Sequence, residues 1–192
     1  MEKDTQSSHG HMVQNLDKSY RISDVLPVEL FMKLWEENLD PTVHGWTLNN
    51  RSYSNDMGSV SWRRADKYLD PDVMLEVSEC IGKKIEEETG HKLYWERCHV
   101  NGQTAGQISS IHTDYRDTEH ITAILFCCPQ WNTQWGGTFM VYDENISKYE
   151  YYSYLPNSAA IIPSQWEHFG ESPNHFTHEM RVTIAFMFKI VG

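Results

Sequence analysis

Apolar residues recur at helical spacing in two segments of the first half of the chain. The first segment predicts an amphipathic helix over residues 27–39, and the Asp-Pro pair at 40–41 is expected to end it. A second Asp-Pro pair at 70–71 is a typical helix start, and the apolar positions that follow continue to Gly90, a common C-terminal stop. The sequence therefore predicts two helices before residue 91.

After Gly90 the pattern changes to short apolar runs that Gly, Pro and Asn separate. Val, Ile, Thr, Phe and Tyr dominate these runs, as is typical of strands. We expect eight strands, over about residues 92–100, 107–112, 119–128, 137–143, 150–155, 158–162, 166–170 and 180–190. Eight short strands with no helix between them predict a sandwich, a jelly roll or a barrel, here backed by two N-terminal helices.

Length and composition indicate one globular domain. The chain has 192 residues, of which 40% are hydrophobic. Residues 1–19 are polar and lack an apolar period, so we expect a disordered or loosely docked arm there and a single domain over residues 20–192.

The net charge and the cysteines narrow the possible partners and the cellular compartment. The net charge of −11 argues against a nucleic-acid partner or an anionic membrane surface. The chain shows neither a secretion signal nor an apolar run long enough for a membrane span. The four cysteines form no C-x-x-C pair or disulfide framework, so we expect a cytoplasmic protein. The sequence carries no signal of oligomeric state.

Two histidines and an aspartate form a candidate metal site. His112 and Asp114 are two residues apart, so on a strand they share one face. Alone, this pair fits the end of a surface strand equally well. In a jelly roll, His168 would lie across the barrel mouth from them, and the loop residues His175 and His178 are alternatives for this third position. Two histidines and one carboxylate are the facial triad of non-haem Fe(II) oxygenases.

Arg181 is a candidate anion-binding residue. It begins the last apolar run of the chain, where a buried arginine needs an anionic partner. Thr183 follows on the same face, and the two could hold a carboxylate together. A strand-end arginine that reaches water is the alternative.

These elements together resemble the 2-oxoglutarate/Fe(II)-dependent oxygenases, and more closely their prolyl 4-hydroxylase-like branch. The resemblance rests on Arg97–Gly102 leading to His112–Asp114, on Ile121–Trp131 and Trp135–Tyr142, and on His168 followed by Pro173 and Arg181. It implies a double-stranded β-helix, the distorted jelly roll of that family. It also implies that His112, Asp114 and His168 bind Fe(II), and that Arg181 binds the distal carboxylate of 2-oxoglutarate.

The resemblance further implies the use of O2, and of ascorbate to keep the iron reduced. Hydroxylation would then be coupled to the conversion of 2-oxoglutarate to succinate and CO2. Two positions depart from the family pattern: Phe126 stands where a tyrosine often contacts 2-oxoglutarate, and the earlier strand offers Asn101 in place of another tyrosine.

The substrate is the least constrained prediction. The resemblance favours a peptidyl proline, with a small molecule or free amino acid as alternatives, and a non-catalytic cupin-like metal-binding module as a third. Nucleic-acid demethylation is disfavoured because Met187 stands where the repair enzymes carry a second arginine. We expect the residues facing the substrate to include Tyr53, Trp62, Tyr115, Arg116 and Trp166.

Overall fold

Two antiparallel sheets form the body of the molecule. The computed structural model describes residues 16–49, 61–107 and 109–192. Within these residues, one sheet has seven strands in the order β1-β8-β5-β10-β4-β3-β2, and the other has three in the order β7-β6-β9. The bounds are β1 Tyr20–Ile22, β2 Trp46–Asn49, β3 Ser61–Arg64, β4 Leu93–Gln103, β5 His120–Phe126, β6 Phe139–Asp143, β7 Lys148–Tyr152, β8 Ser158–Pro163, β9 His168–Gly170 and β10 Arg181–Ile190.

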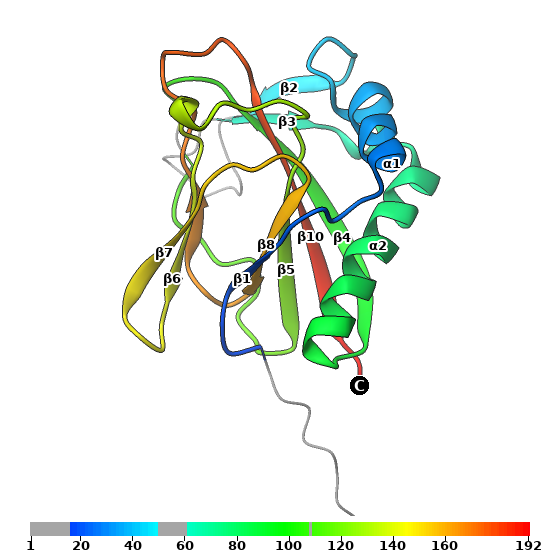
Figure 1. The fold of residues 1–192 in the computed structure, drawn as a ribbon, viewed down its shortest axis with the longest axis vertical. Helices are drawn as coiled ribbons and strands as arrows, with labels where there is room; N and C mark the ends of the chain where they lie inside the picture. Colours follow the sequence, from blue (N-terminus) through cyan, green and yellow to red (C-terminus); the bar gives the residue numbers. More distant parts are fainter. Residues whose placement is uncertain (1–15, 50–60, 108) are drawn as a thin grey trace, which may run out of the picture.

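Two helices precede most of the sheet, as predicted. Helix α1 covers Val28–Leu34 and continues as a π-helical turn over Trp35–Leu39. Helix α2 covers Pro71–Thr89. Figure 1 shows both helices on one side of the large sheet, with β6 and β7 on the other. Short 3₁₀ turns lie at Asp66–Tyr68 and Thr133–Trp135.

The ends of α2 follow from local chemistry. The Asp70 carboxylate accepts hydrogen bonds from the backbone N–H groups of Asp72 and Val73, which have no partner inside the helix. At the other end Gly90 adopts the left-handed conformation, with φ +76°, that closes many helices.

Strand β10 separates the core from a cavity. Its side chains alternate, so Val182, Ile184 and Phe186 face away from Arg181 and Thr183. On the apolar face, Phe188 lies against α2, where a Cβ on Gly82 would be 3.4 Å from its ring. The opposite face of β10 is therefore left to line the cavity between the two sheets.

The mainly β prediction is confirmed, although one predicted strand is not formed. In the described part of residues 107–112, only His112 pairs with another segment, through a single bridge to His168. The predicted arm over residues 1–19 falls mostly outside the described residues and stays a prediction.

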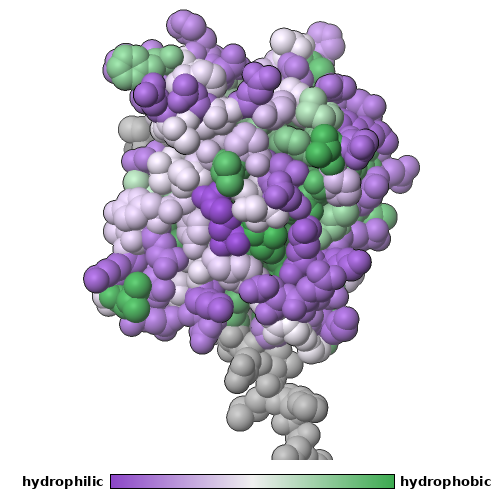
Figure 2. All heavy atoms as spheres, in the orientation of Figure 1, coloured by the Kyte–Doolittle hydropathy of each residue, from purple (hydrophilic) through white to green (hydrophobic). Residues whose placement is uncertain are grey.

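Hydrophilic residues dominate the face of the molecule shown in Figure 2. Among the described helices, none combines the length and apolar character needed to cross a bilayer.

The Asp70 cap gives a stability prediction. Replacing Asp70 by alanine removes the acceptor for two backbone N–H groups, so we expect the free energy of unfolding to fall by about 1 kcal/mol. Urea denaturation followed by circular dichroism measures this change. Glu76→Ala, within the same helix but away from its end, is the matched control. An equal loss in both variants would show that the cap contributes nothing specific.

Candidate metal centre and cosubstrate cavity

A two-residue bridge brings His112 and His168 together. Each backbone N–H donates to the carbonyl of the other residue, over 3.1 Å from His112 and 2.9 Å from His168. Residues directly opposite each other in an antiparallel pair project to the same face. The imidazole centroids consequently lie 4.5 Å apart.

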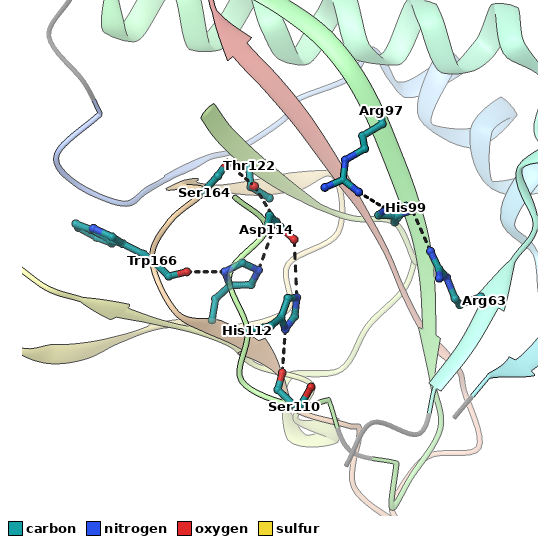
Figure 3. A network of polar contacts seen from close by, with 10 residues as sticks. Arg63, Arg97, His99, Ser110, His112, Asp114, Thr122, Ser164 and Trp166 are labelled. Carbon is teal, nitrogen blue, oxygen red and sulfur yellow. Dashed lines mark hydrogen bonds and ion pairs between the residues drawn. The ribbon is translucent and has the colours of Figure 1, made fainter. Parts of the chain in front are cut away.

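Hydrogen bonds orient both imidazoles. Nδ1 of His112 lies 2.9 Å from the carbonyl oxygen of Ser110, and Nδ1 of His168 lies 2.9 Å from that of Trp166. A carbonyl oxygen only accepts, so each Nδ1 carries the hydrogen and Nε2 of the neutral ring carries the lone pair. Figure 3 shows the ring of His112 turned toward Asp114.

Asp114 completes the cluster from the segment after His112. Its Oδ2 lies 3.5 Å from Nε2 of His168, and its Oδ1 lies 3.9 Å from Nε2 of His112. The buried hydroxyl of Thr122 donates to Oδ2 over 2.8 Å and also contacts Ser164 Oγ at 2.8 Å. Thr122 therefore fixes the orientation of the carboxylate.

The environment keeps Asp114 ionised. Burial alone would raise its pKa, but contacts with His168, Thr122 and His112 lower the pKa to about 2. A carboxylate facing two imidazole nitrogens is a strong donor set for a cation.

The donor set fits a divalent first-row metal. The candidate ligand atoms of His112, Asp114 and His168 all lie within 4.8 Å of one another. Ligand atoms about 2.0–2.2 Å from a metal and at right angles to one another lie about 3 Å apart, so a small inward movement would complete the site. Two imidazole lone pairs and a carboxylate that converge without a cation would repel one another.

Arg181 lines the same cavity, which has a volume of about 250 Å³. Its side chain is only 2% exposed, and the structure describes no acidic residue paired with it. Nε donates to the Gly137 carbonyl over 2.8 Å, and Nη1 donates to Gln103 Oε1 over 3.0 Å. Nη2 is buried and has no hydrogen-bond partner within residues 16–49, 61–107 and 109–192.

Two glycines make room for this guanidinium. A Cβ on Gly137 would lie 3.1 Å from Cδ of Arg181, and one on Gly170 would lie 3.1 Å from Nη1. Gly137 also has φ +80°, a conformation that other residues rarely adopt. Both glycines stand at the ends of predicted strands, over residues 137–143 and 166–170, and the sequence gave no sign of this contact.

The other predicted cosubstrate residues lie beside Arg181. Thr183 Oγ1 accepts from Arg181 Nη1 over 3.5 Å, and Asn101 is the register partner of Thr183 on β4. Both line the cavity. Phe126 is fully buried, with its ring centroid 6.0 Å from the guanidinium carbon of Arg181.

The residues predicted to face the substrate are only partly brought together. Tyr53 lies outside the described residues. Trp62 occupies the face of β3 opposite to Arg63, which lines the cavity. Arg116 is exposed and does not line the cavity.

Trp166 and Tyr115 do not lie on the cavity surface, where they were expected to face the substrate. Trp166 belongs to a turn rather than a regular strand, and its buried indole points away from the metal centre (Figure 3). Tyr115 contacts Arg97, a cavity residue, through its hydroxyl and its ring. The structure therefore does not place Trp166 at the cavity, and it places Tyr115 behind a cavity residue.

Several cavity residues were not predicted. Gln103 holds Arg181 from a strand 78 residues earlier in the sequence, and Thr122, just outside the cavity lining, holds Asp114. Arg63, His99 and Arg97 line the cavity wall formed by β3 and β4. The stretches that carry the family resemblance contain Arg97, His99 and Thr122, but nothing in them assigned these residues to the site.

Comparison with known proteins gives structural but not sequence matches. No protein-family model and no curated protein matches the sequence. A prolyl hydroxylase from Trichoplax adhaerens, solved with a peptide of hypoxia inducible factor, has a TM-score of 0.70 at 16% identity, over 91% of this chain and 84% of its own. A Pseudomonas putida prolyl-4-hydroxylase has a TM-score of 0.63 at 14% identity, over 92% and 95% of the two chains.

A third similar structure is HygX from Streptomyces hygroscopicus, solved with nickel, 2-oxoglutarate and hygromycin B. Its TM-score is 0.63 at 10% identity, over 90% of this chain and 83% of its own. At these identities the comparison establishes the fold. The chain has the jelly-roll fold of the 2-oxoglutarate/Fe(II) oxygenases.

The metal centre gives a direct prediction. His168→Ala removes one of the three candidate ligands, so we expect binding of Fe(II) or Mn(II), measured by anaerobic calorimetry, to weaken at least 100-fold. His178→Ala is the matched control, because His178 is exposed on the following loop. Equal metal affinity in the two variants would exclude His168 as a ligand.

Thr122 gives a subtler prediction. Thr122→Val keeps the shape of the side chain but removes the hydrogen bond to Asp114 Oδ2. Loss of a partner that orients a ligand typically weakens metal binding about 10- to 100-fold. The same calorimetric titration measures this effect, and an unchanged affinity would contradict the orienting role of Thr122.

Proposed function

We propose that the protein is an Fe(II)- and 2-oxoglutarate-dependent oxygenase that hydroxylates its substrate. In this proposal His112, Asp114 and His168 hold the metal, and Arg181 holds the distal carboxylate of 2-oxoglutarate. The proposal is supported by the fold, by the convergence of the triad, and by the position of Arg181 in the same cavity.

The single observation that carries the proposal is the buried guanidinium of Arg181. A metal site alone does not require an arginine, and burying an unpaired cation costs several kcal/mol. The Nη2 group has no partner among the described residues, so it is available to a ligand carboxylate. This favours the oxygenase over the alternative of a cupin-like module that only binds a metal.

Residues of the cavity wall would bind and orient 2-oxoglutarate. Arg181, Thr183 and Gln103 would anchor 2-oxoglutarate at its distal end, while Asn101 lines the wall beside it. The Fe(II) and 2-oxoglutarate held by these residues would supply the activation of O2: one oxygen atom would enter succinate as CO2 leaves, and the other would enter a C–H bond of the substrate. A triad that occupies one face of the metal leaves the opposite face for these molecules.

Two substrate classes follow from the resemblance: a prolyl residue in a peptide, and a small molecule or free amino acid. The similar structures include enzymes solved with either kind of compound. Succinate formation in the presence of Fe(II), 2-oxoglutarate, ascorbate and O2 should rise when the correct class is added. Stimulation by non-peptide compounds alone would exclude the prolyl substrate while leaving the oxygenase proposal intact.

Arg181 provides the decisive variant. A charge-assisted hydrogen bond contributes about 1.5–3 kcal/mol, so Arg181→Gln should weaken 2-oxoglutarate binding about 10- to 100-fold. Arg181→Lys should also bind weakly, because an ammonium cannot reproduce the planar fork. The visible absorption of the Fe(II)–2-oxoglutarate chelate, recorded without O2, measures the affinity.

Lys148→Gln is the control for this experiment, since Lys148 is exposed on β7 and the substitution also removes one positive charge. Metal affinity should be the same in all these variants. If the wild-type protein binds metal but never forms the chelate, the oxygenase proposal fails and the metal-binding module remains.

A further inference from the structure

A second group of basic side chains lies on the cavity wall. Nη2 of Arg63, on β3, lies 3.0 Å from Nδ1 of His99, and Nη1 of Arg97 lies 2.8 Å from Nε2 of the same ring. Figure 3 shows the two guanidinium groups reaching His99 from either side. We call these three residues the basic wall.

The hydrogen bonds within the basic wall cannot all be made. Burial lowers the pKa of His99, and the charges of Arg63 and Arg97 lower it further, against weaker opposing effects of Asp66 and Asp114. A neutral imidazole offers one lone pair, whereas both of its nitrogens face guanidinium donors. One of the two arginines therefore directs an N–H group at a ring nitrogen that cannot accept it.

The cavity does not supply the missing negative charge. Among the described residues, its lining contains Arg63, Arg97 and Arg181 but a single acidic residue, Asp114. With a divalent metal and 2-oxoglutarate in place, the charges of the metal, Asp114, 2-oxoglutarate and Arg181 cancel. The two positive charges of the basic wall remain, in a protein whose overall charge is −11.

Within the basic wall, Arg97 lies away from the cosubstrate end of the cavity, whereas Arg63 is paired with Asn101, nearer that end. On the paired strands β4 and β10, Gln103 is opposite Arg181, whereas Arg97 is opposite Met187. Met187 is also paired with Thr122, the residue that holds Asp114. Arg97 and Arg181 therefore stand toward opposite ends of the cavity, and Arg97 is level with the metal centre.

Arg97 is held in position before any ligand arrives. Its guanidinium carbon lies 5.1 Å from the centroid of the Tyr115 ring, and its Nε donates to the Tyr115 hydroxyl over 3.3 Å. Tyr115 in turn stacks on His120 at 3.7 Å and donates to Glu96 over 2.6 Å. A cation fixed in this way loses little side-chain entropy when it binds an anion.

We propose that Arg63 and Arg97, arranged around His99, bind an anionic group of the primary substrate. The group is a carboxylate or a phosphate, and it lies beside the carbon that is oxidised. This inference rests on the proposed function, because it takes the Arg181 end of the cavity as the place of 2-oxoglutarate.

The remaining lining defines the rest of the substrate. Ile124, Ala185 and Met187 form an apolar surface of the same cavity. A compact substrate would place a hydrocarbon portion against them and its anionic group between the two arginines. A neutral prolyl peptide would leave the basic wall uncompensated.

Binding without turnover tests the inference. Protein loaded with Fe(II) and 2-oxoglutarate under nitrogen is titrated calorimetrically with inorganic phosphate, because 2-oxoglutarate then blocks the Arg181 site. Two matched pairs identify the source of a carboxylate: acetylproline against its amide, and a proline peptide with flanking glutamates against its glutamine counterpart. We expect phosphate to bind, and one carboxylate probe to bind at least 10-fold more tightly than its neutral partner.

Variants locate the binding. Arg63→Gln and Arg97→Gln should each weaken binding of phosphate and of the preferred carboxylate at least 10-fold, while formation of the 2-oxoglutarate chelate stays unchanged. Lys148→Gln should bind all probes as the wild type does. Arg97 is exposed, so Arg97→Gln tests the inference even if Arg63→Gln fails to fold.

Three results would overturn the inference: equal binding of charged and neutral probes, unchanged phosphate affinity in both arginine variants, or a loss of chelate formation as large as in Arg181→Gln. The last result would assign the basic wall to the cosubstrate. If the wild type forms no chelate, the proposed function fails separately from this inference. Phosphate titration then compares metal-free Arg181→Gln protein with the double variant that also carries Arg97→Gln. A weaker affinity in the double variant shows that the basic wall binds anions.

Discussion

The buried guanidinium of Arg181 is the constraint around which the cavity is built. Removing such a cation from water costs several kcal/mol, and the described residues offer it no carboxylate in return. The carbonyl of Gly137 and the amide of Gln103 offset part of that cost, and the small size of Gly170 lets the group fit. One terminal nitrogen has no partner in the part of the chain that the structure describes, so the cavity is preorganised for an anion that these residues do not provide.

The charged groups that line the cavity are spread along strand β10 and the strands beside it. The metal centre projects into it from the bridge between His112 and His168, with Arg181 toward one end and Arg97 toward the other. Because these charged side chains are held by fixed strands, they need not rearrange when a ligand binds. Such preorganisation is how a rigid site achieves specificity. A dicarboxylate and a second anion could therefore occupy one cavity without competing.

The sequence predicted what depends on local chemistry. The helix from Asp70 to Gly90 follows from its caps, and the third member of the candidate metal cluster, His168, followed from strand order in a jelly roll. Contacts that need the tertiary fold were missed: Gln103 reaches Arg181 across 78 residues, with no motif to signal it. Trp166 was expected on the face of His168 because a regular strand was assumed, but a turn occupies that position.

The account depends on a metal held by the triad and a carboxylate held by Arg181 in one cavity. A crystal structure of the protein with Mn(II) and 2-oxoglutarate, with the anomalous scattering of manganese recorded, tests both claims at once. The account predicts one anomalous peak between His112, Asp114 and His168, and 2-oxoglutarate joining that peak to the Arg181 guanidinium. Manganese at another position, or 2-oxoglutarate bound without contact to Arg181, would contradict it.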